Sequence, residues 1–510
     1  MRYRLPVLAW TYSVLFLAVL FSPYRAAQAS TYLELDDEAY TLLSRLEAEG
    51  VITSGLLATR PISRQEAMRL LREAETNAAE RGPFVQGIIS ELQRRVSPIS
   101  PDAAEPVQGS VYASYVWARD PRTDLSFPGA SRETRQVLTY NHDGDLYDLG
   151  SNGRAGFTAR AEDLGPLSVY LNPEVRSSDE GTQAVLRTGY VVLGFSWIDI
   201  VAGKDSQWWG PGYHGALLLS DNAAPPPMIK VTAPEPLILP WFLKYLGPFQ
   251  YVMFLSQLEE DRTDFPRPFF WGMRLSFKPH RSVEIGLERT ALMGGSGRPL
   301  NTRLVLQSIF GSREQTTGQD PGDQRAGFDV TVTLPFKSQP MQLYWERAGE
   351  ENRQRNLRWP YKLANLYGVY LPRLLGLERV GVRAEYASDH VNEQPDVWYT
   401  HGAYTAGYTY DGMIIGHHMG TDAKDRFVEL SCLVPEHHAQ LFLSYDKETH
   451  NVEGPVRETT SAVAARARIS LTRQTAVTVT GGMGRVENPG MRPGVDRTVG
   501  KASLEVRYEF

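Results

Sequence analysis

The sequence predicts an all-β transmembrane β-barrel of about 18 antiparallel strands, preceded by an N-terminal α-helical bundle or plug. Three observations lead to this prediction. Beyond residue 29, no apolar run reaches the ~20 residues that a membrane-spanning helix needs. From about residue 107 onward, apolar and polar residues alternate with a period of two. Short and long connections also alternate along the chain, which is typical of barrels with tight turns at one end and long loops at the other.

The first 29 residues have the three parts of a bacterial signal peptide. Arg2 and Arg4 form a basic start, residues 7–21 are apolar and uncharged, and Ala27-Gln28-Ala29 is a small-x-small cleavage site. We expect export across the inner membrane, with cleavage before Ser30. The alternative, an uncleaved anchor, is disfavoured because the apolar core is short.

Composition narrows the possible partners and cofactors. The formal net charge is −6, which argues against nucleic acid as a partner. Cys432 is the single cysteine, so no internal disulfide can form, and no cysteine stands at the cleavage site for a lipid anchor. We expect a monomer without cofactors, in contact with outer-membrane lipids.

Residues 30–106 are predicted to form a periplasmic helical bundle. In "LDDEAYTLLSRLEAEG" the apolar residues recur at helical spacing, and Gly50 is a plausible stop. Ser63 and Glu66 form an S-x-x-E capping box at the start of a second helix. A third helix is expected over residues 84–96, ending before a proline.

Residues 107–510 are predicted to form the outer-membrane barrel. The last segment, "SLEVRYEF", places four apolar residues on one face and Ser, Glu, Arg and Glu on the other. In a membrane barrel the apolar face meets lipid and the charged face lines the lumen. The aromatic end, Tyr508 and Phe510, resembles the signal that the barrel-insertion machinery reads. The four apolar positions are Leu504, Val506, Tyr508 and Phe510.

Connection lengths favour a membrane barrel over a soluble β-sandwich, which has no reason to alternate so regularly. Counting strands from an outward-running first strand gives an even number and places the fifth strand near residues 198–203. Long outer loops are then expected at about 206–235 and 398–425. The predicted tight turns are 278–281, 337–340, 435–438 and 472–475, and the further long connections are 292–325, 389–425, 447–459 and 485–498.

Two loop stretches resemble the Wzi family of capsule assembly proteins. They are "WWGPGYHGALLLSDNAAPPP" (208–227) and "WYTHGAYTAGYTYDGMIIGHHMGTD" (398–422). The N-terminal "YTLLSRLEAEGVI" and "RPISRQEAMRLL" also fit the helical head of many members. The resemblance implies an eighteen-stranded outer-membrane barrel with a helical bundle at its periplasmic mouth. It also implies a lectin-like role, in which the surface-facing side attaches or organises exported capsular polysaccharide or another exopolysaccharide.

The aromatic residues of these loops are the candidate carbohydrate-binding residues. Sugar rings stack their C–H faces on indole and phenol rings, and histidine can hydrogen-bond the hydroxyls. Two alternatives stay open: an aromatic girdle at the lipid interface, or a loop that packs inward and closes the lumen. Adjacent residues in an extended segment point to opposite sides, so one tryptophan of the pair should face a cavity. The candidates are Trp208, Trp209, Tyr213, His214, Trp398, Tyr399, His401, Tyr404 and Tyr408.

The sequence predicts neither a catalytic site nor a metal site. His417 and His418 are adjacent, so on a strand they would point to opposite faces, and no acid or cysteine stands at ligand spacing near them. The glycine run in "ALMGGSGRPL" lacks the Lys-Ser/Thr of a phosphate loop. The competing function is a carbohydrate-selective porin, which would need an open polar channel.

Overall fold

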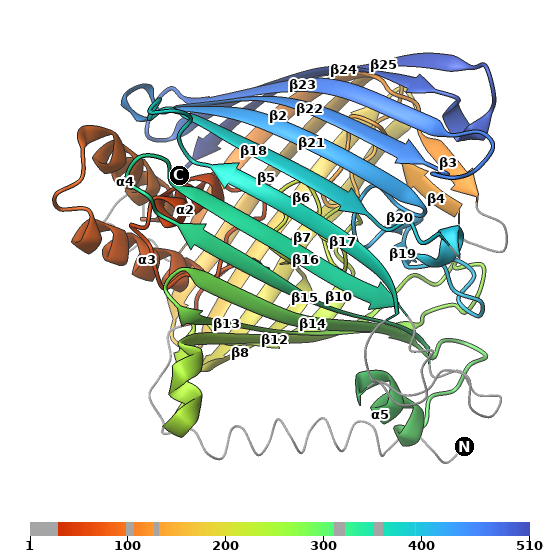
Figure 1. The fold of residues 1–510 in the computed structure, drawn as a ribbon, viewed down its shortest axis with the longest axis horizontal. Helices are drawn as coiled ribbons and strands as arrows, with labels where there is room; N and C mark the ends of the chain where they lie inside the picture. Colours follow the sequence, from red (N-terminus) through yellow and green to blue (C-terminus); the bar gives the residue numbers. More distant parts are fainter. Residues whose placement is uncertain (1–28, 98–106, 127–131, 311–321, 351–360, 393) are drawn as a thin grey trace.

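The computed structural model describes residues 29–97, 107–126, 132–310, 322–350, 361–392 and 394–510. It is a closed antiparallel β-barrel with a group of helices at one end (Figure 1). Within the described residues, no helix is long and apolar enough to cross a membrane. Nearly all of the expected signal peptide, residues 1–28, lies outside the described residues.

In the described part of the chain, eighteen strands form the wall, which confirms the predicted number and antiparallel arrangement. The barrel closes where the last strand pairs with the first. In order around the wall the strands are β2 (Val107–Arg119), β5 (Gly150–Leu164), β6 (Leu167–Ser178), β7 (Gly181–Phe195), β8 (Ile198–Lys204), β10 (Pro227–Thr232), β12 (Pro248–Gln257), β13 (Phe269–His280), β14 (Val283–Met293), β15 (Asp323–Leu334), β16 (Met341–Glu350), β17 (Tyr361–Leu371), β18 (Val380–Ser388), β21 (Ala423–Val434), β22 (Ala439–His450), β23 (Glu458–Ser470), β24 (Thr475–Glu487) and β25 (Asp496–Glu509).

The fifth strand is β8, as the strand count predicted, but the loop after it is shorter than expected. Residues 227–232 form the sixth strand, β10, whereas the sequence assigned them to a loop running to about residue 235. The strand begins at the last residue of the proline-rich "AAPPP" (223–227), a stretch that is more typical of a loop. A proline is compatible with the first position of a strand, which Pro227 occupies.

The last strand shows why the wall suits a lipid environment. Leu504, Val506, Tyr508 and Phe510 point outward and are 47%, 43%, 43% and 44% exposed. Between them, Glu505 and Arg507 point into the lumen, as predicted. Leu441, Leu443 and Tyr445 on β22 and Val107, Val111 and Tyr115 on β2 are also exposed. The outer face is therefore an apolar belt around a polar interior.

Within residues 29–97, three α-helices pack together at the end of the barrel where the tight turns lie, which we name the short-turn end. They are α2 (Ala39–Ala48), α3 (Arg64–Asn77) and α4 (Pro83–Val96). Gly50 ends α2 with a φ of 71°, and Ser63 caps α3 by accepting a 2.9 Å hydrogen bond from the amide of Glu66. Glu47 pairs with Lys278 at 2.5 Å, which ties α2 to the wall.

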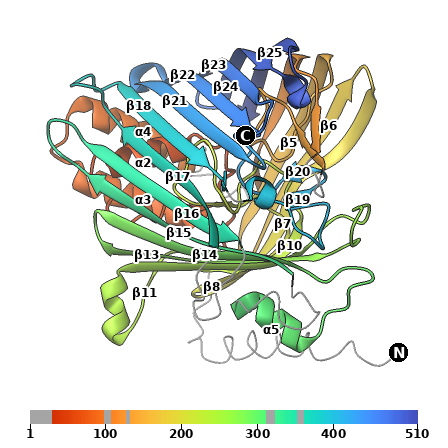
Figure 2. The ribbon, with the colours of Figure 1, turned by 45° about the vertical axis from the view of Figure 1, so that its right-hand side comes forward.

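The opposite end, which we name the long-loop end, carries further loops and short strands (Figure 2). The ribbon around β19 (Thr409–Tyr410) and β20 (Met413–Ile414) lies across the mouth of the barrel. A hairpin of β3 (Thr123–Ser126) and β4 (Arg132–Arg135) lies beside it. The smaller elements are not confined to this end, since η1 and η3 lie at the short-turn end and β1 pairs with β9 inside the barrel. They are α5 (Thr302–Phe310), η1 (Trp241–Leu246), η2 (Pro395–Val397), η3 (Pro435–His437), η4 (Pro489–Met491), β1 (Thr59–Arg60), β9 (Trp208–Trp209) and β11 (Leu237–Ile238).

Candidate functional site

The loop between β8 and β10, residues 205–226, folds into the lumen; we name it the plug loop. Its short strand β9 pairs with β1 of the N-terminal segment. The amide of Gly210 donates a hydrogen bond to the carbonyl of Ala58 at 2.9 Å. The amide of Trp209 donates to the carbonyl of Leu219, also at 2.9 Å. The plug loop therefore starts at the long-loop end and meets, inside the barrel, the segment that enters from the other end.

The two adjacent tryptophans point in opposite directions. Trp209 is fully buried, with its ring 5.4 Å from that of Phe254 on β12. Trp208 lines an internal cavity, and its indole N–H donates to the carbonyl of Gly212 at 3.1 Å. The Gly-Pro-Gly turn thus fixes the Trp208 ring by a direct hydrogen bond. One ring belongs to the core and the other to the cavity, as expected for neighbours in an extended segment.

The cavity occupies the lumen between the plug loop and the helices and has a volume of about 450 Å³. It extends from Arg95 and Glu509 near the short-turn end to Trp208, Tyr213 and His214 of the plug loop. Arginines from several strands and from the N-terminal segment line it, together with acidic residues of both regions. The lining of the cavity is therefore charged and carries both positive and negative groups.

Tyr213 and His214 are held by the wall opposite the plug loop. Both backbone amides donate to the carboxylate of Glu385, at 2.6 and 2.9 Å. The Tyr213 hydroxyl donates to Glu429 at 3.1 Å, and the guanidinium of Arg383 lies 4.4 Å from the centre of its ring. Ordered backbone and side-chain contacts thus fix the tip of the plug loop across the full width of the lumen.

The second motif stretch lies in the loop between β18 and β21; we name residues 394–422 the cover loop. Tyr399 and Tyr408 are fully buried, and their hydroxyls donate to the plug-loop carbonyls of Leu217 and Leu218 at 2.7 and 2.9 Å. Trp398 and Tyr404 are also fully buried, and they donate to the carbonyls of Lys362 and Gly294. These four rings join the cover loop to the plug loop and the wall.

His401 differs from these four residues because its side chain is only half-buried. Its Nδ1 accepts hydrogen bonds from the amides of Ala403 and Tyr404, which fixes the local turn. The four fully buried rings of the cover loop cannot touch a glycan in this arrangement of the loops. The carbohydrate-binding role of the nine candidate residues stays a prediction.

The prediction of no metal site rested on a local geometry that the structure contradicts. His417 and His418 lie in a turn rather than on a strand, with ring centres 4.5 Å apart. Acids reach them from two wall strands: Asp425 on β21 and Asp446 on β22. The sequence drew attention only to the adjacent histidines, because Asp446 and His214 are remote from them along the chain.

Together, the fold and the site define a membrane-type β-barrel whose lumen is sealed at the long-loop end by two interlocked loops. The chain belongs to the family of the capsule assembly protein Wzi, whose family model matches residues 126–500. The predicted family is thereby confirmed.

Two comparisons describe relatives in Klebsiella pneumoniae and Escherichia coli. An uncharacterized 55.8 kDa protein in the cps region of Klebsiella pneumoniae is 27% identical over 342 residues. The match spans 66% of this chain and 61% of that relative's length. The solved structure of Wzi from Escherichia coli, described as an outer-membrane, carbohydrate-binding β-barrel involved in group 1 capsule assembly, has a TM-score of 0.73 and 21% identity. The match covers 94% of this chain and 100% of the E. coli chain, and it shows the same fold.

Proposed function

We propose that this protein binds polysaccharide at the outer-membrane surface and holds exported capsular or related polysaccharide there. The observation that carries the proposal is the sealed lumen of a barrel in this family. Two relatives support it: the E. coli protein is described as carbohydrate-binding, and the Klebsiella protein is encoded in a cps region.

Transport through the lumen, the competing function, needs an open polar channel. Here the plug loop contacts β12, β16, β18 and β21, and the cover loop is bonded to it. Fully buried leucines and tyrosines fill the space between the two loops. A barrel closed in this way is suited to binding rather than to permeation, so we favour attachment over a porin.

The proposed topology follows from the ends of the barrel. Residues 1–29 act as a cleaved signal peptide, residues 30–106 form the periplasmic bundle, and residues 107–510 form the outer-membrane barrel. The short-turn end, which carries the helices, faces the periplasm, and the long-loop end faces outward. Tyr508 and Phe510 serve as the assembly signal, and the protein acts as a monomer without catalysis.

We place the glycan contact on the outer face of the cover loop. His401 and Tyr410 are half-buried there, and Asp411 is exposed. A half-exposed tyrosine ring offers a stacking face, while histidine and aspartate offer hydrogen bonds to hydroxyls. The fully buried candidates, such as Tyr399 and Tyr408, hold this face rigid beneath the glycan, which lowers the entropy cost of binding.

The test uses purified barrel and polysaccharide extracted from the surface of the producing bacterium, with binding followed by surface plasmon resonance. The double variant His401→Ala/Tyr410→Ala should bind several-fold more weakly, since a lost aromatic contact is worth about 1 kcal/mol. His437→Ala, exposed at the short-turn end, is the matched control. Unchanged binding by the double variant would contradict a glycan contact on the outer face of the cover loop. Absence of binding by the parent would end the proposal.

A further inference from the structure

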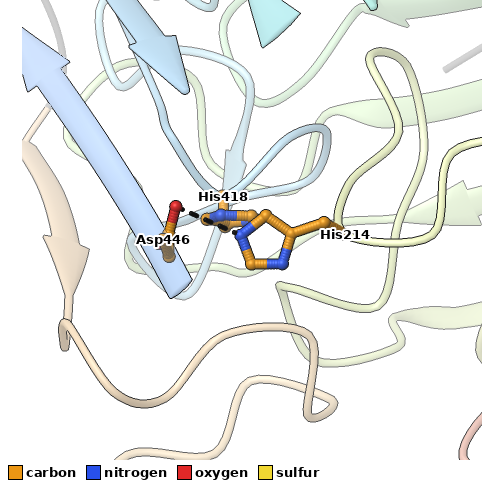
Figure 3. Close-up of side chains that lie close together, drawn as sticks. All are labelled: His214, His418 and Asp446. Carbon is orange, nitrogen blue, oxygen red and sulfur yellow. Dashed lines mark ion pairs between the residues drawn. The ribbon is translucent and has the colours of Figure 1, made fainter. Parts of the chain in front are cut away.

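A cluster of buried histidines and carboxylates lies where the plug loop and the cover loop meet the wall. His214 comes from the plug loop, His418 from the cover loop and Asp446 from β22 (Figure 3). Their ligand atoms all lie within 4.8 Å of one another, and the three side chains point toward a common centre. Asp425 on β21 and His417 form a second group of the same kind that shares His418.

Several polar atoms of this cluster lack partners of their own. Nε2 of His214 and Nδ1 of His418 are buried without a hydrogen-bond partner within the described residues. Nε2 of His418 has one acid close by, Oε1 of Glu448 at 3.2 Å. One carboxylate oxygen of Asp425 and one of Asp446 are likewise buried and unpartnered there. Burying a polar group without a partner costs on the order of 1–3 kcal/mol. A site with four such atoms is costly unless something else satisfies them.

The spacings suit shared coordination better than direct hydrogen bonding. Nε2 of His214 lies 3.6 Å from Oδ1 of Asp446 and 3.6 Å from Oδ2 of Asp425. Nε2 of His418 also lies 3.6 Å from Oδ2 of Asp425. These three distances exceed those of N–H···O hydrogen bonds, whereas Oε1 of Glu448 lies 3.2 Å from Nε2 of His418. Two ligand atoms on a tetrahedral zinc ion lie about 3.3 Å apart, given bonds of about 2.0 Å.

Packed aromatic rings fix the orientation of the imidazoles. The His214 ring stacks on Phe427 with a centroid distance of 3.8 Å, and His418 stacks on Tyr140 at 4.5 Å. Gly215 lets the backbone approach His417 closely, since a Cβ there would lie 2.2 Å from its Nε2. The histidines are thus held in place by their neighbours, as metal ligands need to be.

We propose that one divalent transition-metal ion of the zinc class binds here, through His214, His418 and Asp446, with Asp425 as a further candidate ligand. Imidazole ligands favour such an ion over Ca²⁺ or Mg²⁺, which prefer oxygen. The ion cross-links the plug loop, the cover loop and the wall, three parts distant in sequence. It therefore locks the seal of the lumen, and it does so whether or not glycan is bound.

The test measures zinc binding to the full-length barrel, purified without a histidine tag and treated with a chelator. After addition of Zn²⁺ and gel filtration, elemental analysis should find one zinc per chain. Co²⁺ in place of Zn²⁺ should give the visible absorption of a tetrahedral or five-coordinate site. Asp446→Asn and His418→Asn should each weaken zinc binding roughly tenfold or more. His437→Ala, outside the cluster, should bind like the parent.

Folding and metal binding can be separated in the same experiment. Each variant is first checked for the heat-modifiable barrel, and Asp446→Asn keeps the size of the side chain it replaces. Zn²⁺ should also slow proteolysis of the two loops in the parent but not in Asp446→Asn. The proposal is overturned if the folded parent binds no zinc at micromolar concentration. It is equally overturned if folded Asp446→Asn and His418→Asn bind zinc as the parent does.

Discussion

At the scale of single residues, the aromatic side chains of the plug loop and the cover loop mainly connect segments that are far apart in sequence. Trp209 fills a site beside Phe254, and the tyrosines of the cover loop donate to backbone carbonyls of the plug loop. Their hydroxyls satisfy carbonyls that would otherwise be buried without a partner, which explains why tyrosine rather than phenylalanine stands there.

The tryptophan pair allows a comparison within one dipeptide. Trp209→Ala leaves a large cavity in a fully buried site, so we expect it to lower the free energy of unfolding by about 3–5 kcal/mol. Trp208→Ala opens onto an existing cavity and should cost clearly less. Denaturant unfolding in detergent, followed by the heat-modifiable band, measures both. Equal losses for the two variants would contradict the assignment of one ring to the core and the other to the cavity.

The hydroxyl of Tyr399 bridges the two loops. It donates to the carbonyl of Leu217 and accepts from the amide of His417 at 3.0 Å. Tyr399→Phe leaves both groups buried and unsatisfied, so local opening should become easier by about 1–3 kcal/mol. Hydrogen exchange of residues 398–422 should speed up accordingly. Tyr445→Phe, which changes an outward-facing ring, is the control and should leave these rates unchanged.

Glu133 gives the seal a dependence on pH. Burial raises the pKa of Glu133 to about 7, although hydrogen bonds donated by Thr421 act in the opposite direction. The folded carboxyl therefore binds its proton more tightly than the unfolded one, whose ordinary pKa is 4.5. The stabilising contribution is complete below pH 4.5 and is lost as the pH rises through about 7.

We therefore expect the contact between the β3–β4 hairpin and the cover loop to loosen as the pH rises from 5 to 8. Limited proteolysis or hydrogen exchange near Thr421 measures this. Glu133→Gln, neutral at every pH, should abolish the dependence. A Gln variant with the same pH profile as the parent would show that another group is responsible.

At the scale of elements, local rules predicted those parts whose structure depends on neighbours in sequence. The sequence correctly predicted three such features: the alternation in β25, the helix cap at Ser63 and the helix end at Gly50. Each follows from residue spacing or from backbone preference. β10 was missed because it is six residues long and begins at the last of three consecutive prolines. Short strands rely on pairing with neighbours that the sequence does not display.

The site was less predictable, for a different physical reason. The motif residues themselves were recognisable, but their direction depended on contacts such as Tyr408 with Leu218, which join residues 190 positions apart. The histidine cluster is a sharper case: strand geometry would separate His417 from His418, whereas a turn brings their rings together. Which side of a loop becomes buried is decided by tertiary contacts rather than by local pattern.

At the scale of the whole molecule, the two ends of the barrel are covered by different parts of the chain. The helices lie at the short-turn end, and the interlocked loops lie at the long-loop end. In a planar bilayer, the intact protein should therefore conduct poorly. Replacing residues 206–225 by a glycine-serine linker together with deletion of 31–99 should open the lumen and raise single-channel conductance. Large, steady currents from the intact protein would instead favour a porin.

The closure of the wall itself depends on the last residue. The amide of Phe510 donates to the carbonyl of Gly109 at 2.9 Å, and the amide of Gly109 donates back at 3.1 Å, so this residue ends the seam between β25 and β2. Its ring points outward at the short-turn end of the apolar belt.

Phe510→Asp would place a charge in that belt, which is unfavourable in a lipid environment. We expect deletion of Phe510, or Phe510→Asp, to lower the amount of folded, heat-modifiable barrel in outer-membrane fractions. Phe510→Tyr, which keeps an aromatic ring, should assemble like the parent. Normal levels of the Asp variant would show that neither the terminal ring nor its apolar setting is needed for assembly.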